Sequence, residues 1–453
     1  MSAAVKIAVC LGAVAMAQLA HAAEPIIVPH TRPDAALRLA QAEPARASAA
    51  ALRKVITDLQ RGTPDAASME PALYAALQTQ GVAALIARLG ALERIEYVTT
   101  QSGADIYRVT FANGGSLWTI AVSPAGRIAG LFFRPLDGPE KAGEDVTVAG
   151  LSGTLLKPAG VERPPVVLLI AGSGPTDRNG NQAGSGPGEL RQLAEALAQR
   201  GIASLRYDKR GIGRSATAGL NEQDLVLDTF AADAALWLAW LRQRSDLGAP
   251  VVAGHSEGGL IAILIAEGRR APGVRGRLDK QIDKLLDKPT PAGAIVLLAT
   301  PGRPLGEVLR EQLRRSDMPA ALLDEALATL ARLEKGETVG DVRLELSALF
   351  RPSVQPFMRS MLAVDPAREL SSLKLPVMIV SGGHDLQVTA ADAARLAKAR
   401  PDAVRLDLPD MNHVLKITPA DRAEQQDAYA NPSLPLAPGL GDAIAAFVRR
   451  VAQ

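Results

Sequence analysis

Gly254, Ser256 and Gly258 form a Gly-x-Ser-x-Gly pattern that occurs once in this chain. An apolar run typical of a buried strand, PVVAGHS (250–256), leads into the serine, and a helical pattern, GGLIAILIAEG (258–268), follows it. A strand, a sharp turn and a helix are the surroundings of a nucleophile elbow, in which the glycines leave room because side chains there would collide with neighbouring backbone. We therefore interpret Ser256 as a nucleophile, against the alternative of an incidental serine in a glycine turn.

A serine hydroxyl needs a general base to become a strong nucleophile, and the chain has five histidines. Two of them lie within the first 30 residues, His255 should point away from the neighbouring Ser256, and His384 belongs to the SGGHD motif. His413 follows the last predicted strand, AVRLDL (403–408), so its ring is expected in a loop at the carboxyl edge of the sheet. His413 is therefore the candidate base, and an uninvolved surface-loop histidine is the alternative.

The base needs a carboxylate that orients its ring, and Asp385 directly follows the predicted strand PVMIVSGG (376–383). Asp385 also precedes His413 in the chain, which gives the order Ser, Asp, His. Asp407 and Asp410 are rivals. The first lies inside a strand pattern, and the second is too close in sequence to fold back on the histidine. We therefore predict that Asp385 orients the base.

Acyl transfer also needs backbone N–H donors that stabilise the oxyanion of the tetrahedral intermediate, each contributing about 3–4 kcal/mol. Glu257, the residue after the serine, should supply one donor through its backbone. The second is expected from the loop AGSGPTDRNGN (171–181), which follows the predicted strand VVLLI (166–170) and in which Ser173 can present its amide. This chemistry requires neither a metal nor an organic cofactor.

The overall charge argues against one class of partner. The chain has 50 lysine and arginine residues and 48 aspartate and glutamate residues, so its net charge is only +2. Proteins that bind nucleic acid usually carry a concentrated basic surface. We therefore expect a small-molecule ester substrate and no nucleic-acid partner, and the sequence leaves the oligomeric state open.

The N-terminus has the pattern of a cleavable secretory signal. Lys6 precedes the apolar run IAVCLGAVAMAQLA, and the small-x-small triplet AHA ends at Ala22. The apolar run is short for a membrane span. We expect residues 1–22 to be removed and residues 23–46 to form a leader. The product would be periplasmic or secreted, with no stable membrane insertion.

The remaining sequence predicts two domains. Residues 47–135 combine a helical pattern with strand-like runs and hairpin signals, which predicts a small α+β domain. Residues 146–453 alternate strands with helices, which predicts a mostly parallel sheet covered on both faces. The interval 302–370 lacks strand signals and has amphipathic helical patterns, so we expect a helical cap above the sheet. The segment GPEKAGED (138–145) is the expected linker.

Taken together, residues 146–453 resemble the α/β-hydrolase superfamily, in particular a bacterial carboxylesterase branch with a related serine-aminopeptidase-like group. Residues 47–135 more loosely resemble an accessory domain that precedes such hydrolases. The motifs that carry the resemblance are AGSGPTDRNG, YDKRGIGRS (207–215), GHSEGG, SGGHD and MNH. The resemblance implies an α/β-hydrolase fold with a catalytic triad and an oxyanion hole, whose residues would be Ser256, Asp385 and His413, and Ser173 and Glu257.

The oxyanion loop differs from the pattern common in this superfamily, and the motif YDKRGIGRS is expected to have a structural role. The oxyanion loop opens with Ala171-Gly172 in place of the common His-Gly. In YDKRGIGRS, Asp208 and Arg210 are expected to fix the loop rather than to take part in the chemistry.

These residues predict a carboxylesterase-type serine hydrolase that cleaves short-chain acyl esters through an acyl-enzyme. A triad does not distinguish esters from amides, so a serine peptidase acting on short peptides remains an alternative. An acidic cap residue that binds a substrate ammonium, such as Glu311 or Glu325, would favour the peptidase. The third alternative is an inactive binding protein of the cell envelope.

Overall fold

The computed structural model describes residues 46–452, except for 72, 75–76, 78–85, 87–88, 102–103, 113, 124, 137–142, 183–184, 216–220, 267–290 and 317. The predicted signal peptide and nearly all of the leader therefore lie outside the described residues. The chain divides into two compact units between Glu140 and Lys141, a position inside the predicted linker.

In the smaller unit, a helix packs on an antiparallel sheet with the strand order β1-β2-β3-β4. Apolar residues at helical spacing, such as Leu52, Ile56 and Leu59, pack against Tyr107 and Trp118 of the sheet. The elements are α2 (Ala47–Gln60), β1 (Leu92–Gln101), β2 (Ala104–Phe111), β3 (Gly114–Val122) and β4 (Ile128–Leu136). This is a small α+β arrangement of the kind that the sequence predicts.

The larger unit is built on an eight-stranded sheet with the order β12-β11-β10-β9-β7-β8-β6-β5. The six strands β7 to β12 pair in parallel with one another. Strands β5 and β6 form the leading antiparallel hairpin, and β6 joins it to the sheet by pairing antiparallel with β8. The strands are β5 (Glu144–Val148), β6 (Leu151–Leu156), β7 (Val166–Ile170), β8 (Ala203–Tyr207), β9 (Pro250–His255), β10 (Ile295–Leu298), β11 (Val377–Gly382) and β12 (Val404–Leu408). The expectation of a mostly parallel sheet is confirmed.

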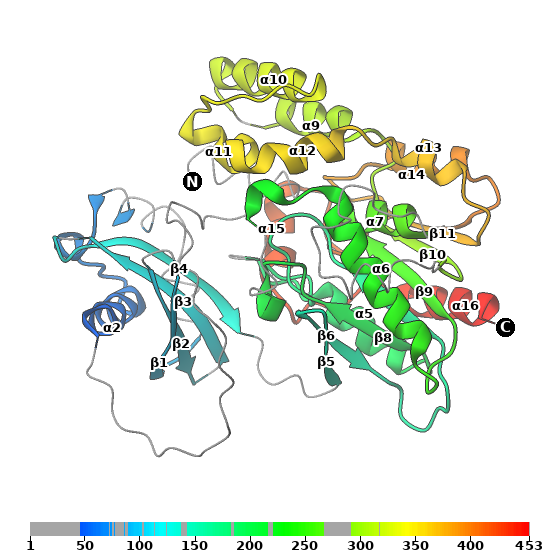
Figure 1. Cartoon of the computed structure of the whole chain (residues 1–453), viewed down its shortest axis with the longest axis horizontal. Coiled ribbons are helices and arrows are strands. Elements are labelled where there is room, and N and C mark those ends of the chain that lie inside the picture. The colour runs from blue at the N-terminus through cyan, green and yellow to red at the C-terminus, as the bar shows by residue number, and fades with distance from the viewer. Residues whose placement is uncertain are drawn as a thin grey trace, which may run out of the picture. The chain divides into compact units, whose positions relative to one another are not determined.

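Both faces of this sheet are covered, as strand β7 illustrates. Val166, Leu168 and Ile170 face one apolar core, and Val167 and Leu169 face the other, because successive side chains of a strand point to opposite faces. Helices α6 and α7 cover the first face, and α5 and α16 cover the second (Figure 1). Among the described residues of the larger unit, the helices outside the cap are α5 (Glu189–Ala198), α6 (Leu227–Gln243), α7 (Glu257–Ala266), α14 (Ala390–Ala399), α15 (Arg422–Ala430) and α16 (Leu440–Val451).

The segment between β10 and β11 forms a helical cap, as expected (Figure 1). Its helices are α9 (Leu305–Arg314), α10 (Ala320–Glu334), α11 (Ser347–Phe350), α12 (Gln355–Leu362) and α13 (Pro366–Ser371). Short 3₁₀ turns lie at Ala66–Ser68, Gly213–Ser215, Glu222–Asp224, Leu344–Leu346 and Pro352–Val354.

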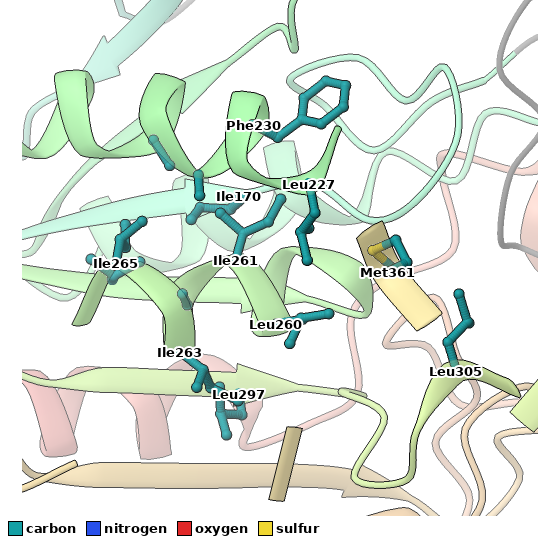
Figure 2. Packing of buried hydrophobic residues seen from close by; sticks show 14 of the residues in the cluster. Ile170, Leu227, Phe230, Leu260, Ile261, Ile263, Ile265, Leu297, Leu305 and Met361 are labelled. Atoms are coloured by element: carbon teal, nitrogen blue, oxygen red, sulfur yellow. The ribbon is translucent and has the colours of Figure 1, made fainter. Parts of the chain in front are cut away.

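The cap shares the apolar core above the sheet. Figure 2 shows Leu305 of α9 and Met361 of α12 near Leu260 of α7, and the three residues line one pocket. Among the helices in the described part of the chain, none combines the length and the apolar character that crossing a bilayer requires.

Candidate active site

Ser256 lies in a tight turn between β9 and α7. Its φ is 54°, in the left-handed region that non-glycine residues rarely adopt, so β9 ends at His255, one residue earlier than predicted. A Cβ atom at Gly254 would collide with the carbonyl of Gly258, and one at Gly258 would collide with the carbonyl of Ile170. The backbone N–H of Ser256 donates to Leu298 O at 2.8 Å. These contacts hold the serine at the carboxyl end of a central strand.

His413 and Asp385 are joined by a buried hydrogen bond. His413 Nδ1–H donates to Asp385 Oδ2 at 2.8 Å, and the side chains are 6% and 0% exposed. The other carboxylate oxygen accepts the backbone N–H groups of Gln387 at 2.8 Å and Val388 at 2.9 Å. Because Nδ1 carries the proton in this arrangement, Nε2 of the neutral ring is left as a proton acceptor.

The rival carboxylates lie elsewhere. Asp407 accepts from Ser381 Oγ at 2.5 Å and from Arg405 Nη2 at 2.8 Å, on the surface of β12 and β11. The side chain of Asp410 is 66% exposed and lies 3.8 Å from His384 Nε2. Of the three aspartates considered, Asp385 is thus the one that the structure pairs with His413.

His255 has a contact that the sequence analysis missed. Its Nε2–H donates to the backbone carbonyl of His413 at 2.8 Å, and the two rings lie 4.9 Å apart. Burial lowers the pKa of His255 to about 3, so its ring is neutral near pH 7. His255 therefore anchors the backbone of His413 beside the serine turn. Its position at the end of a central strand, next to Ser256, was the available signal.

Ser173 and Glu257 line one pocket together with Ser256. As the first residue of α7, Glu257 has a backbone N–H without an acceptor inside its helix. Ser173 follows β7, and its carbonyl accepts from Thr176 Oγ1 at 2.7 Å and from Gln182 Nε2 at 3.0 Å. These bonds fix the loop that carries the second predicted donor.

The pocket has a largely aliphatic lining. Besides Ser173, Ser256 and Glu257, its lining residues are Leu260, Pro301, Arg303, Leu305, Val308, Gln312, Met361, Val364, Pro366, Gln387 and Val388. Most of them come from the cap or from the segments next to it. The pocket therefore presents a mainly apolar surface to a group held at Ser256.

Arg303, which lines the pocket, and two acidic residues of the cap have oppositely charged partners. Arg303 donates to Asp392 at 2.8 Å and to Glu311 at 2.6 Å. Glu325, the other cap carboxylate considered for binding an ammonium, lies 4.0 Å from Arg343. Both carboxylates that would favour a peptidase are thus paired with arginines.

Two residues of the YDKRGIGRS motif have structural partners, as expected. The carboxylate of Asp208 accepts from the backbone N–H groups of Arg178 at 2.9 Å and Arg214 at 2.8 Å. Arg210 forms a buried ion pair with Asp233 of α6. These bonds tie the loop after β8 to its neighbours.

Comparisons with known proteins find one peptidase family and several esterases. Residues 184–278 match the family described as serine aminopeptidase, S33. Esterase EstD of Thermotoga maritima is 29% identical over 336 residues, which cover 70% of this chain and 73% of that protein. Among solved structures, Est1E from Butyrivibrio proteoclasticus matches with a TM-score of 0.41 and 16% identity, over 69% of this chain and 99% of its own. The Pyrococcus furiosus esterase Pf2001 matches with a TM-score of 0.40 and 15% identity, over 69% and 91%.

Proposed function

Because the chain belongs to the α/β-hydrolase superfamily and is a carboxylesterase-type hydrolase, we propose that it cleaves short-chain carboxylic esters with Ser256, His413 and Asp385. The observation that carries this proposal is the buried hydrogen bond from His413 to Asp385, together with the contact of His413 with His255, the residue before a serine at φ 54°. No metal or organic cofactor takes part in the proposed chemistry.

In the first half-reaction, Ser256 Oγ attacks the carbonyl carbon of the ester while His413 Nε2 takes the hydroxyl proton. The carboxylate of Asp385 stabilises the imidazolium that forms. The backbone N–H groups of Ser173 and Glu257 donate to the oxyanion of the tetrahedral intermediate. When the intermediate collapses, the bond to the alcohol oxygen breaks, and His413 gives its proton to the departing alcohol.

In the second half-reaction, His413 takes a proton from water as the water oxygen attacks the acyl-enzyme carbonyl. A second tetrahedral intermediate forms in the same oxyanion hole. Its collapse breaks the bond to Ser256 Oγ, which regains a proton from His413, and releases the carboxylic acid.

The pocket supports an apolar acyl group. Its lining is mainly aliphatic, as is usual for sites that bind small molecules. Short alkyl esters fit this chemistry, because the ester is the only polar group that they bring to Ser256.

The second candidate function is peptidase activity on short peptides, and the match to the serine aminopeptidase family favours it. An aminopeptidase must bind the ammonium at the substrate's N-terminus. Glu311 already accepts from Arg303, and Glu325 lies near Arg343, so neither is a ready counter-ion for that ammonium. The pairing therefore favours ester substrates. An inactive envelope-binding protein would not need the pairing of Asp385 with His413.

The predicted signal at residues 1–22 supports a further proposal, that the enzyme acts in the periplasm or outside the cell. N-terminal sequencing of the protein from the periplasm or medium of the producing cells should begin at Ala23. An intact N-terminus in the cytosolic fraction would contradict this proposal.

The test of the function uses p-nitrophenyl esters of increasing acyl length beside aminoacyl p-nitroanilides. We expect turnover that is fastest on short acyl esters and that disappears in Ser256→Ala, because no other nucleophile is present in the proposed mechanism. Ser204→Ala is the control, since Ser204 is a buried serine on β8 whose hydroxyl has no hydrogen-bond partner in the described structure. Unchanged turnover in Ser256→Ala, or faster turnover of the anilides, would overturn the proposal.

A further inference from the structure

Lys209 is a buried lysine two residues after the end of β8, and the proposed mechanism gives it no role. Its side chain is 3% exposed, so the desolvation of the ammonium must be offset by specific partners. Nζ donates to the carbonyl oxygen of Gly172 at 2.6 Å and to Glu257 Oε1 at 3.5 Å. Both partners belong to the segments that carry the predicted oxyanion donors.

The contact with Gly172 controls the direction of one donor. The carbonyl of Gly172 and the N–H of Ser173 belong to the same peptide group, and a trans peptide is planar with these two groups pointing in opposite directions. The ammonium that holds Gly172 O therefore also fixes the direction in which the N–H of Ser173 points. It polarises the peptide as well, which strengthens the N–H as a donor.

The contact with Glu257 concerns the other donor. Glu257 is the first residue of α7, and its side chain is 3% exposed. Within the described residues, Glu257 Oε2 has no hydrogen-bond partner, so the contact of Oε1 with Lys209 is the polar anchor of this side chain. Anchoring the side chain restricts the backbone at the turn that presents the N–H of Glu257.

We propose that Lys209 is the positioning residue of the oxyanion hole, whose ammonium sets the backbone N–H groups of Ser173 and Glu257 at the distance that the oxyanion requires. This inference rests on the proposed function. It adds to that function a residue that contacts the segments of both donors, Lys209, and that does not touch the substrate.

The other cations of the YDKRGIGRS motif do not have this arrangement. Arg210 pairs with Asp233 of α6, and Arg214 pairs with Asp145 at the start of the larger unit. Lys209 is thus the member of the motif that contacts the segments of both donors. Burial lowers the pKa of Lys209, and the nearby carboxylate of Glu257 opposes that shift.

The test replaces Lys209 with methionine, which keeps the length and the apolar stem of the side chain but removes its charge. Loss of one oxyanion donor lowers kcat by about 10²–10³-fold, so loosening two donors should lower kcat by at least about tenfold. KM should change by less than about threefold, because the oxyanion forms only after the substrate has bound. A merely structural lysine would not separate kcat from KM in this way.

The matched control is Arg400→Met. Arg400 is also a buried cation that donates to backbone carbonyls, those of Leu373 and Leu375 at 3.0 Å each, at the opposite edge of the sheet. We expect kcat to be unchanged in this control, whereas its Tm falls. Equal losses of kcat in both variants would overturn the proposal, because they would indicate a general effect of removing a buried cation.

Inhibitors provide a second readout. An alkyl trifluoromethyl ketone forms a tetrahedral adduct with the serine, and this adduct carries an oxyanion. The matching methyl ketone forms no such adduct. Lys209→Met should weaken inhibition by the trifluoromethyl ketone at least about tenfold and leave weak binding of the methyl ketone unchanged. Equal effects on both ketones would contradict the proposal.

If Lys209→Met does not fold, Glu257→Met decides, because it removes the side-chain acceptor that Lys209 contacts and keeps the backbone N–H. A fall in kcat at constant KM supports the proposal, and an unchanged kcat overturns it, because the proposal requires the contact between Lys209 and Glu257 to hold one of the donors. Wild-type protein without esterase turnover would instead refute the proposed function, so the two failures are distinguishable.

Discussion

At the residue scale, the sequence predicted the proposed catalytic residues better than the residues that hold them. Ser256, Asp385 and His413 each follow a predicted strand, and parallel strands bring their carboxyl ends to one edge of the sheet. The contacts of His255 and Lys209 were missed because each binds a backbone carbonyl that lies far away in the sequence, at His413 and Gly172. Motif patterns record side chains and do not show which carbonyls fold next to them.

A prediction at this scale concerns the carboxylate behind His413. In Asp385→Asn, the amide can donate to Nδ1, which favours the tautomer whose Nε2 carries the proton and can no longer act as the base. We expect kcat for a p-nitrophenyl ester to fall by about 10⁴-fold, as loss of the triad carboxylate does elsewhere, with an unchanged circular dichroism spectrum. Asp410→Asn, which alters an exposed aspartate, should retain full activity. A loss of less than tenfold in Asp385→Asn would remove Asp385 from the proposed triad.

At the element scale, strands were predicted more accurately than helices. The predicted strand 166–170 coincides with β7, because a fully buried strand gives a continuous apolar run between turns. Helices α14 and α15 had no counterpart in the sequence analysis. In α14 the segment AADAARLAKA has mainly small alanine side chains, which give a weak apolar periodicity, and its start is set by a capping box between Thr389 and Asp392.

A prediction at this scale concerns Glu189, the first residue of α5. Burial raises the pKa of Glu189 to about 8 from its usual 4.5, so between these values the folded state binds a proton that the unfolded state has lost. The free energy of unfolding should therefore fall as the pH rises from about 4.5 to about 8. The buried Lys416, whose pKa burial lowers to about 8 from 10.5, changes stability with the opposite sign and only above that window.

Urea unfolding at several pH values checks this expectation. Glu189→Gln remains neutral at every pH, so its stability should fall less between about pH 5 and pH 8 than that of the wild type. Glu195→Gln, an exposed position on the same helix, should follow the wild type. Parallel pH profiles for the wild type and Glu189→Gln would show that Glu189 does not carry this proton.

At the scale of the whole molecule, the alternation of strands and helices predicted the fold class and the cap but not the strand order. Strand β9 pairs with β7 although β8 lies between them in the chain, because β8 pairs on the other side of β7. This order places the serine turn after β9 beside the loop after β7. The lining of the pocket was likewise beyond the sequence, because it combines residues of the elbow, the cap and the loop after β11.

The central claim is that Ser256 carries the acyl group during ester cleavage. The most direct measurement mixes the full chain with p-nitrophenyl acetate, quenches the reaction with acid during the burst, and maps the acetyl group by peptide mass spectrometry. We predict one acetyl group, on Ser256, and its accumulation in Lys209→Met at a slower rate. Rapid ester turnover with no acetyl group on Ser256, or with the acetyl group on another residue, would contradict the account.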